Sequence, residues 1–488
     1  MTDRAPLIAV HGYGTYAISY RHMIEFAKVE APHVEWAMLL PTSHHLDVVS
    51  GVLGVDRILC LEHEQGRASL SMPSEAELAD YYGNIFTDIE AEKKVFKHRP
   101  AAEQLMLAVQ IYRIYKAFLL RLKPTHLLMA HIETFDGKVL VSLARELNIP
   151  VLIPTDLRHL GGIYFSRDAQ EQIPDYRQVT PNGKEWAAKT IAAFRSKPGP
   201  AFAPDMFSAS GEELLPIGRK SLPKRVWGFV SRTWRNPRMF EPELFLLNLK
   251  YTFPWVLERF RAIRAYRNER CYDSKELAEL PSKFIYYPLQ VTPESSINTP
   301  APYYVDQMRA IDAIRFAMPS DWMLVVKEHR ASLGIRPTSF YRALRQKAGV
   351  HIAHAAMSSI ELIKEAQVTI SVTGSATLEA FLLGRPALVL GGCFIADYLG
   401  GVCPIDALPS RIEASVSSPL SDQQILSALA EIHSVRYECV FRPADEPGHF
   451  GNRAQNMKRM IHAVLDHIGR LDGADRIPPL GPFARAKS

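Results

Sequence analysis

Two separate stretches of the chain alternate strand-like and helix-like segments, and this constrains the fold more than any other feature. LIAVH (7–11) opens the first stretch and FIYYPLQ (284–290) opens the second, each followed by a helix-like pattern. Strands that alternate with helices usually pair in parallel, and the helices cross over the faces of the sheet. The sequence therefore predicts an α/β protein with two parallel sheets.

The alternation stops between about Arg167 and Leu280, where prolines and charges become frequent. A chain of 488 residues is also too long for one compact core. Parallel sheets bind ligands beyond the carboxyl ends of their strands, so we expect a ligand in a cleft between the two α/β domains. We predict an N-terminal α/β domain over 1–195, a helical linker or insert over 196–280, a second α/β domain over 281–420, and C-terminal helices with a tail over 421–488.

Charge, cysteine content and hydropathy limit the partners, the metal or disulfide sites and the cellular location that we expect. A net charge of +5 is too mildly basic to indicate a nucleic-acid partner. The five cysteines are odd in number and include no C-x-x-C pair, so they indicate neither a zinc site nor a disulfide framework. The sequence shows no signal peptide and no apolar run of about 18 residues. We expect a cytoplasmic protein without a metal.

The strongest candidate site of the second domain follows the strand VTISV (368–372). Thr373, Gly374 and Ser375 precede a helix there, and a helix N-terminus favours an anion such as a phosphate. Glu379 lies four residues beyond Ser375, on the same helix face, where it suits the hydroxyls of a ribose. The alternative interpretation is simple capping of the helix by Thr373 or Ser375.

Two further segments of the second domain carry polar candidates. Lys327, His329 and Arg330 follow a strand, and alternation places the first two on one side, where they suit a phosphate. Ser358 and Ser359 begin another helix and offer hydroxyls to the same ligand. A solvated strand end and an ordinary helix cap are the respective alternatives.

The first strand of the chain ends in a glycine-containing turn. Gly12, Gly14 and Ala17 fit the pattern G-x-G-x-x-A that binds dinucleotides. The acidic residue that should end the next strand is missing, so the match is weak. We expect instead a turn that lets another molecule approach the backbone, or a turn of purely structural importance.

Acidic and basic residues follow the later strands of the first domain. Glu133 and Asp136 come after one strand, and Asp136 also suits a helix cap. Asp156, Arg158 and His159 come after the next, where the carboxylate suits a nucleophile or general base and the cations suit an anionic group. The alternative for the second group is an Asx turn with a surface salt bridge.

The stretch 221–240 mixes Lys and Arg with aromatic residues. Such a segment suits an anionic membrane surface or single-stranded nucleic acid, and the alternative is a linker whose aromatics pack on a domain.

Residues 283–392 resemble the nucleotide-binding domain of bacterial capsule and surface-polysaccharide glycosyltransferases, in particular the β-Kdo transferase-like group. The resemblance rests on FIYYPLQ, VVKEH, SSIELI and SVTGSATLEAFLLGRPALVLG. It implies a GT-B fold, with two Rossmann-like domains facing a central cleft, and a CMP-activated acidic sugar used without a metal. His329 would take the role of the family's His-Pro motif, although Arg330 follows it here instead of proline. The hydroxyl role would fall to Ser358, Ser359, Thr373 and Ser375.

By the same resemblance, a carboxylate of the first domain would face the anomeric carbon of the donor sugar. Asp156 is our first choice and Glu133 the second. The predicted function is transfer of Kdo or a similar acidic sugar from a nucleotide-linked donor to a glycan or lipid-linked acceptor, with no other cofactor. The acceptor would enter near Gly12 and Gly14, and Arg158 with His159 would hold a carboxylate or phosphate. The alternatives are a sugar-nucleotide epimerase and a non-catalytic binding subunit of a polysaccharide assembly complex.

Overall fold

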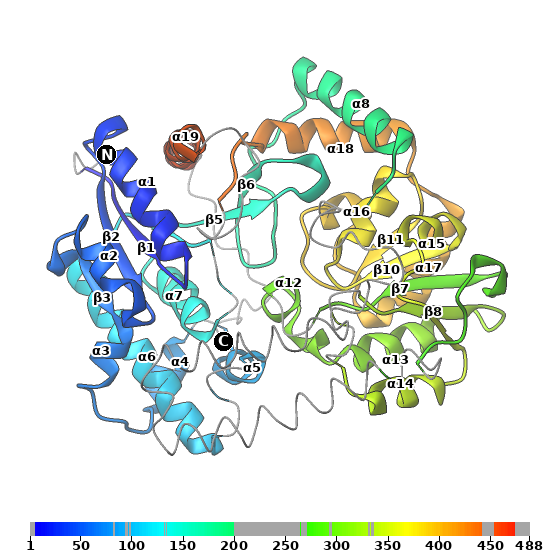
Figure 1. The fold of residues 1–488 in the computed structure, drawn as a ribbon, viewed down its shortest axis with the longest axis horizontal. Coiled ribbons are helices and arrows are strands. Elements are labelled where there is room, and N and C mark those ends of the chain that lie inside the picture. The colour runs from blue at the N-terminus through cyan, green and yellow to red at the C-terminus, as the bar shows by residue number, and fades with distance from the viewer. Residues whose placement is uncertain are drawn as a thin grey trace, which may run out of the picture. The chain divides into compact units, whose positions relative to one another are not determined.

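The computed structural model forms two compact units, which are Met1–Thr190 with Asn298–Pro302 and Leu426–Ser488, and Ile191–Ile297 with Tyr303–Ile425. Each unit is built on its own sheet, so the predicted α/β class is confirmed (Figure 1). The predicted insert over 196–280 lies almost entirely outside the described residues. The structure describes residues 5–81, 83–92, 96, 99–130, 132, 134–199, 264, 271–291, 295–329, 332, 336–441 and 453–473.

The first unit contains a six-stranded sheet in the order β3-β2-β1-β4-β5-β6. Five of its strands pair in parallel, as the alternation predicted, whereas β6 pairs antiparallel with β5. The strands are β1 (Leu7–His11), β2 (Glu35–Leu40), β3 (Ile58–Cys60), β4 (His126–Leu128), β5 (Val151–Asp156) and β6 (Ile163–Ser166).

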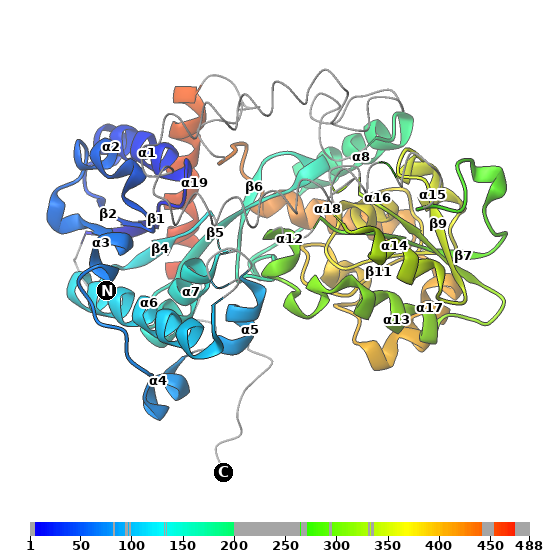
Figure 2. The same ribbon diagram turned by 60° about the horizontal axis from the view of Figure 1, so that its bottom comes forward.

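Helices cover both faces of this sheet, which is why all five residues of β1 are buried. Ile8 and Val10 belong to one core cluster, with residues of α1 (Tyr16–Glu30) and α19 (Arg453–Gly473). Leu7 and Ala9 belong to the other, with α6 (Ala101–Leu122) and α7 (Phe135–Glu146). Figure 2 shows α19, from the far end of the chain, beside α1.

The second unit contains five parallel strands in the order β11-β10-β7-β8-β9. Its strands are β7 (Phe284–Pro288), β8 (Met323–Lys327), β9 (Val350–Ala353), β10 (Val368–Ser371) and β11 (Ala387–Val389). Its main helices are α13 (Gln307–Ala317), α14 (Thr338–Arg345), α15 (Ser359–Glu365), α16 (Ser375–Leu382) and α17 (Leu408–Ser417). The strands predicted at 284–290 and 368–372 are confirmed, each with a slightly earlier end.

The remaining helices are shorter or connect the two units. They are α2 (Leu46–Ser50), α3 (Leu61–Gln65), α4 (Glu75–Asp80), α5 (Ile85–Ala91), α8 (Pro181–Ser196), α12 (Ser295–Asn298) and α18 (Asp422–Val435). Among the described helices, none combines the length and the apolar character that a membrane span requires.

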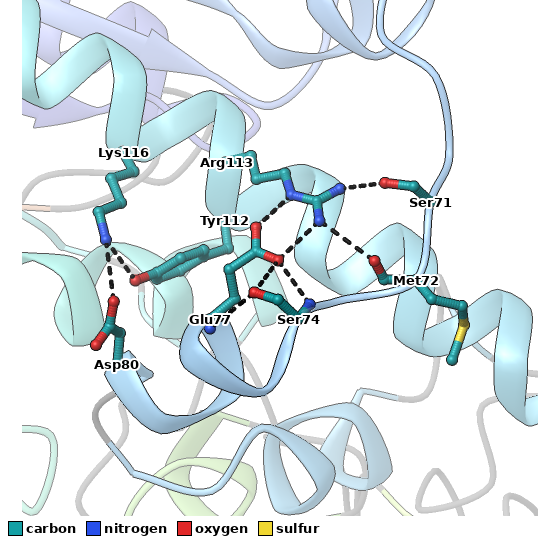
Figure 3. Close-up of polar contacts among 8 residues, drawn as sticks. All are labelled: Ser71, Met72, Ser74, Glu77, Asp80, Tyr112, Arg113 and Lys116. Carbon is teal, nitrogen blue, oxygen red and sulfur yellow. Dashed lines mark hydrogen bonds and ion pairs between the residues drawn. The ribbon is translucent and has the colours of Figure 1, made fainter.

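Arg113 and Lys116 of α6 both form ion pairs with residues of α4 (Figure 3). Ser74 and Glu77 form a reciprocal capping box at the start of α4. Arg113 of α6 donates to both carboxylate oxygens of Glu77, at 2.5 and 2.8 Å, and to the hydroxyl of Ser71 at 2.5 Å. Because the same carboxylate serves the cap and the ion pair, the hydrogen bond from Arg113 lowers the pKa of Glu77 to about 2.

Replacing Glu77 by glutamine should destabilise this unit by about 1 kcal/mol at pH 7, because both the cap and the ion pair weaken. The folded-state pKa of Glu77 lies below its ordinary 4.5, so its contribution is complete above about pH 4.5 and is lost as the pH falls toward 2. Urea unfolding at several pH values measures this difference. Glu75→Gln, in the same helix but outside the cluster of Figure 3, is the control. A wild-type–variant difference that does not shrink with falling pH contradicts the assignment.

Candidate functional site

Strands β7, β8 and β10 are parallel neighbours, so their carboxyl ends lie at one edge of the second sheet. Pro288 near the end of β7 pairs with Lys327 at the end of β8. The structure thereby brings the predicted residues around Lys327 and those around Gly374 to the same edge, although 47 positions separate them in the sequence.

The Lys327 side chain is buried and hydrogen-bonded. Its ammonium donates to the carbonyl oxygen of Met357 at 3.0 Å and to the hydroxyl of Ser359 at 2.6 Å. The sequence assigned Lys327 and Ser359 to one site, and here they are in direct contact. These two bonds hold the loop between β9 and α15 in place next to the ammonium of Lys327.

The neighbouring Ser358 is a helix cap. Its hydroxyl accepts from the backbone N–H of Glu361 at 3.3 Å, so for this residue the capping alternative is observed. His329 is exposed, and its own backbone N–H donates to the carboxylate of Glu328 at 2.7 Å. Arg330 lies outside the described residues.

Gly374 is the N-cap of α16 and no side chain caps this helix start, so the alternative of capping by Thr373 or Ser375 is not observed. The first free N–H of the turn is satisfied by Ser371, whose hydroxyl accepts from Gly374 at 2.9 Å. The φ of Gly374 is −73°, a value that any residue adopts. A Cβ atom there would lie 2.6 Å from the side-chain nitrogen of Gln290 and 2.8 Å from the Ser371 hydroxyl oxygen. Glycine is therefore needed for space.

The start of α16 is more exposed than the residues on either side of it. Gly374 and Ser375 are partly exposed, whereas Thr373 before them is fully buried and Glu379 within the helix is only 3% exposed. Burial raises the pKa of the Tyr286 hydroxyl, and the negative charge of Glu379 adds to the effect. Tyr286 also donates weakly to the Ser359 hydroxyl at 3.4 Å, so Glu379 lies on the side of the site that carries Ser359.

In the first unit, Asp156 ends β5 and forms the Asx turn named above as the alternative. Its carboxylate accepts from the backbone N–H of Arg158 at 2.5 Å. The guanidinium of Arg158 pairs with Glu171 at 3.2 Å, with both side chains largely buried. His159 follows in the 3₁₀ turn Arg158–Leu160.

Glu171 was missed by the sequence analysis. Burial raises the pKa of its carboxyl group, Arg158 opposes the shift, and the charge of Asp156 adds to it. Arg158 and Glu171 both adopt positive φ, of 56° and 60°. The β5–β6 hairpin returns the chain to this place, and neither its antiparallel pairing nor the contact has a periodic signal in the sequence.

The remaining predicted residues lie near the ends of β1 and β4. Asp136 is not a cap, since Thr134 holds that position in α7. Its carboxylate instead bonds to the buried His11 ring at 2.7 Å, which ties the end of β1 to α7. Glu133 lies outside the described residues.

The two glycines after β1 have different structural requirements. A Cβ atom at Gly12 would lie 2.9 Å from Leu40, so close packing requires this glycine. Gly14 has a φ of +52° and open space around its Cα, so the backbone conformation requires the second. The approach of a ligand to the backbone of this turn stays a prediction.

The family model of capsule polysaccharide biosynthesis proteins matches residues 246–398. The resemblance predicted from the sequence is confirmed over this segment. The matched segment, 246–398, includes β7, β8, β9, β10 and β11 and all the described nucleotide-site candidates. No curated protein matches the chain in a sequence search.

Several solved structures are similar to the chain at low identity. The KpsC β-Kdo 2,4 transferase of Thermosulfurimonas dismutans is 11% identical, with a TM-score of 0.32, over 63% of this chain and 87% of that one. The KpsC β-Kdo 2,7 transferase of the same organism is 20% identical, with a TM-score of 0.23, over 46% and 67%. The UDP-GlcNAc 2-epimerase of Neisseria meningitidis is 12% identical, with a TM-score of 0.24, over 94% and 100%.

Replacing Gly374 by alanine tests the close contact in the matched segment. We expect a loss of about 1–3 kcal/mol in the free energy of unfolding, because the added methyl overlaps Gln290 and Ser371. Gly469→Ala is the control, since that helical glycine has open space and alanine there should stabilise by about 0.5–1 kcal/mol. Chemical denaturation of both variants decides, and equal stability of Gly374→Ala and wild type contradicts the contact.

Proposed function

We propose that the chain is a glycosyltransferase of capsule or surface-polysaccharide assembly. The match of residues 246–398 to capsule polysaccharide biosynthesis proteins carries this proposal. The donor would be a CMP-linked sugar, either Kdo or a similar acidic sugar, and the reaction would need neither a metal nor another cofactor. The acceptor would be a glycan or a glycolipid.

The nucleotide would bind at the carboxyl edge of the second sheet. His329 and the partly exposed Gly374 and Ser375 offer an imidazole, a hydroxyl and a helix start to its phosphate. The ammonium of Lys327 donates to the Ser359 hydroxyl, and its positive charge favours an anionic ligand next to that hydroxyl. Arg330 would add a second cation, and Glu379 with Thr373 would shape the ribose side.

The acceptor and the catalytic carboxylate would come from the first unit. Asp156 would act at the anomeric carbon, with Glu133 as the second candidate. The Arg158–Glu171 pair supports this assignment because it places a guanidinium and a second carboxylate next to Asp156. Arg158 and His159 would hold the acidic group of the sugar, and the turn at Gly12 and Gly14 would admit the acceptor.

The proposed location is the cytoplasm, with peripheral contact to the inner membrane through 221–240. The support is the composition of that segment alone, since it lies outside the described residues.

Nucleotide binding can be measured directly by thermal shift with CMP, UDP, GDP and CDP. We expect CMP to stabilise the chain most, by about 2.7 kcal/mol at 100 times its dissociation constant. Preference for UDP would favour the epimerase alternative. Stabilisation by none of the four would contradict the proposed function.

Asp156→Asn tests the catalytic assignment without removing the turn, since the amide oxygen still accepts from Arg158. Transfer from CMP-Kdo to a glycolipid acceptor is measured by the release of CMP. We expect its rate to fall by about 10²–10⁴-fold while the affinity for CMP stays unchanged. Asp168→Asn is the matched control, because Asp168 accepts from Gln170 N–H at 2.8 Å in a similar turn. Unchanged transfer by Asp156→Asn would favour a non-catalytic subunit or the use of Glu133.

A further inference from the structure

We propose that a buried hydrogen-bond network connects the loop after β8 with the loop after β10 and fixes their relative position. Its members are Glu328, Arg336, Gln290 and Ser371, and the sequence assigned no role in the site to any of them. The inference rests on the proposed function in one respect, namely that these two loops hold the nucleotide.

Glu328 anchors the first loop. The residue is 1% exposed, and its carboxylate accepts three hydrogen bonds. Arg336 donates its Nε at 2.8 Å, Tyr341 its hydroxyl at 2.7 Å, and His329 its backbone N–H at 2.7 Å. The last bond fixes the backbone of the histidine assigned to the phosphate.

Arg336 links this carboxylate to the end of the neighbouring strand. Its terminal nitrogen donates to the backbone carbonyl of Gln290, two residues beyond β7. The side chain of Gln307 holds the same backbone from both sides, at 2.7 and 2.8 Å. Gln290 is therefore fixed at both its N–H and its carbonyl group.

Gln290 and Ser371 anchor the second loop. The side-chain nitrogen of Gln290 donates to the Ser371 hydroxyl at 2.9 Å, and that hydroxyl accepts from Gly374 N–H at 2.9 Å. The missing Cβ of Gly374 leaves room for the Gln290 amide. A continuous chain of contacts thus runs from His329 to Gly374.

The free-energy cost of burying the Glu328–Arg336 ion pair indicates that the pair positions the backbone around it and adds little to the stability of the fold. A buried ion pair gives little net stability compared with apolar residues, although removing one partner is costly. A bare carboxylate next to a phosphate site would also repel the ligand, and Arg336 neutralises that charge. The network therefore fixes the backbone at His329 and at Gly374 without presenting a negative charge to an anion.

Tyr341→Phe removes one of the hydrogen bonds that hold Glu328 at one end of the network, and Ser371→Ala removes the link between Gln290 and Gly374 at the other. The two variants form a double-mutant cycle. We expect each to weaken the affinity for CMP by about tenfold, and the double variant by clearly less than the hundredfold product, because both changes loosen the same chain of contacts. Isothermal titration well below the melting temperature measures the affinities.

Tyr287→Phe is the matched control. The Tyr287 hydroxyl is buried and has no hydrogen-bond partner among the described residues, so its removal should leave the CMP affinity unchanged. Ile314→Val in α13 controls for stability, because it removes a buried methylene outside the network and should lower the melting temperature without changing affinity. Full multiplication of the two network effects, or an equal loss in the Ile314 variant, overturns the proposal.

Hydrogen exchange of the ligand-free chain separates this proposal from the proposed function. Tyr341→Phe should speed amide exchange in a peptide covering 371–377, whereas Tyr287→Phe should not. A wild-type chain that binds none of the four nucleotides contradicts the proposed function, and the exchange result then decides the network alone. Equal exchange at 371–377 in both variants overturns the network.

Discussion

Parallel pairing of β7 with β8 on one side and β10 on the other is the constraint on which the second unit depends. It brings three strand ends to one edge and places Gln290 between Glu328 and Ser371. Lys327, Glu328, Gln290 and Ser371 are buried at this edge, and each of them has a hydrogen-bond partner within the protein. The loops that carry the nucleotide candidates are consequently held by side chains from neighbouring strands.

The sequence predicted the strands of both sheets well, because β-branched and apolar runs such as VTISV are short and bounded by turn residues. It missed the three-residue β3 and also β6, whose antiparallel return in a hairpin breaks the alternation that supported the other assignments. It also gave no sign that α19 covers β1, since that packing joins segments more than 400 positions apart.

In the candidate site, too, some features were predictable from the sequence and others were not. The sequence placed Lys327 with Ser359 and found the turn at Gly374 from local residue types. It could not show that the ammonium of Lys327 donates to the Ser359 hydroxyl, or that Gln290 and Ser371 crowd the position of a Cβ atom at Gly374. Glu328 directly follows β8, yet it is buried, and Arg336, eight residues later, returns to pair with it. Such partners are set by tertiary contacts that leave no periodic pattern.

The central claim is that the carboxyl edge of the second sheet binds a nucleotide. The most direct test is a hydrogen-exchange footprint of the wild-type chain with and without saturating CMP. The account predicts slower exchange in two separate peptides, one containing Lys327 to His329 and the other containing Ser371 to Glu379. Slower exchange confined to other strand ends, with both of these peptides unchanged, would contradict it.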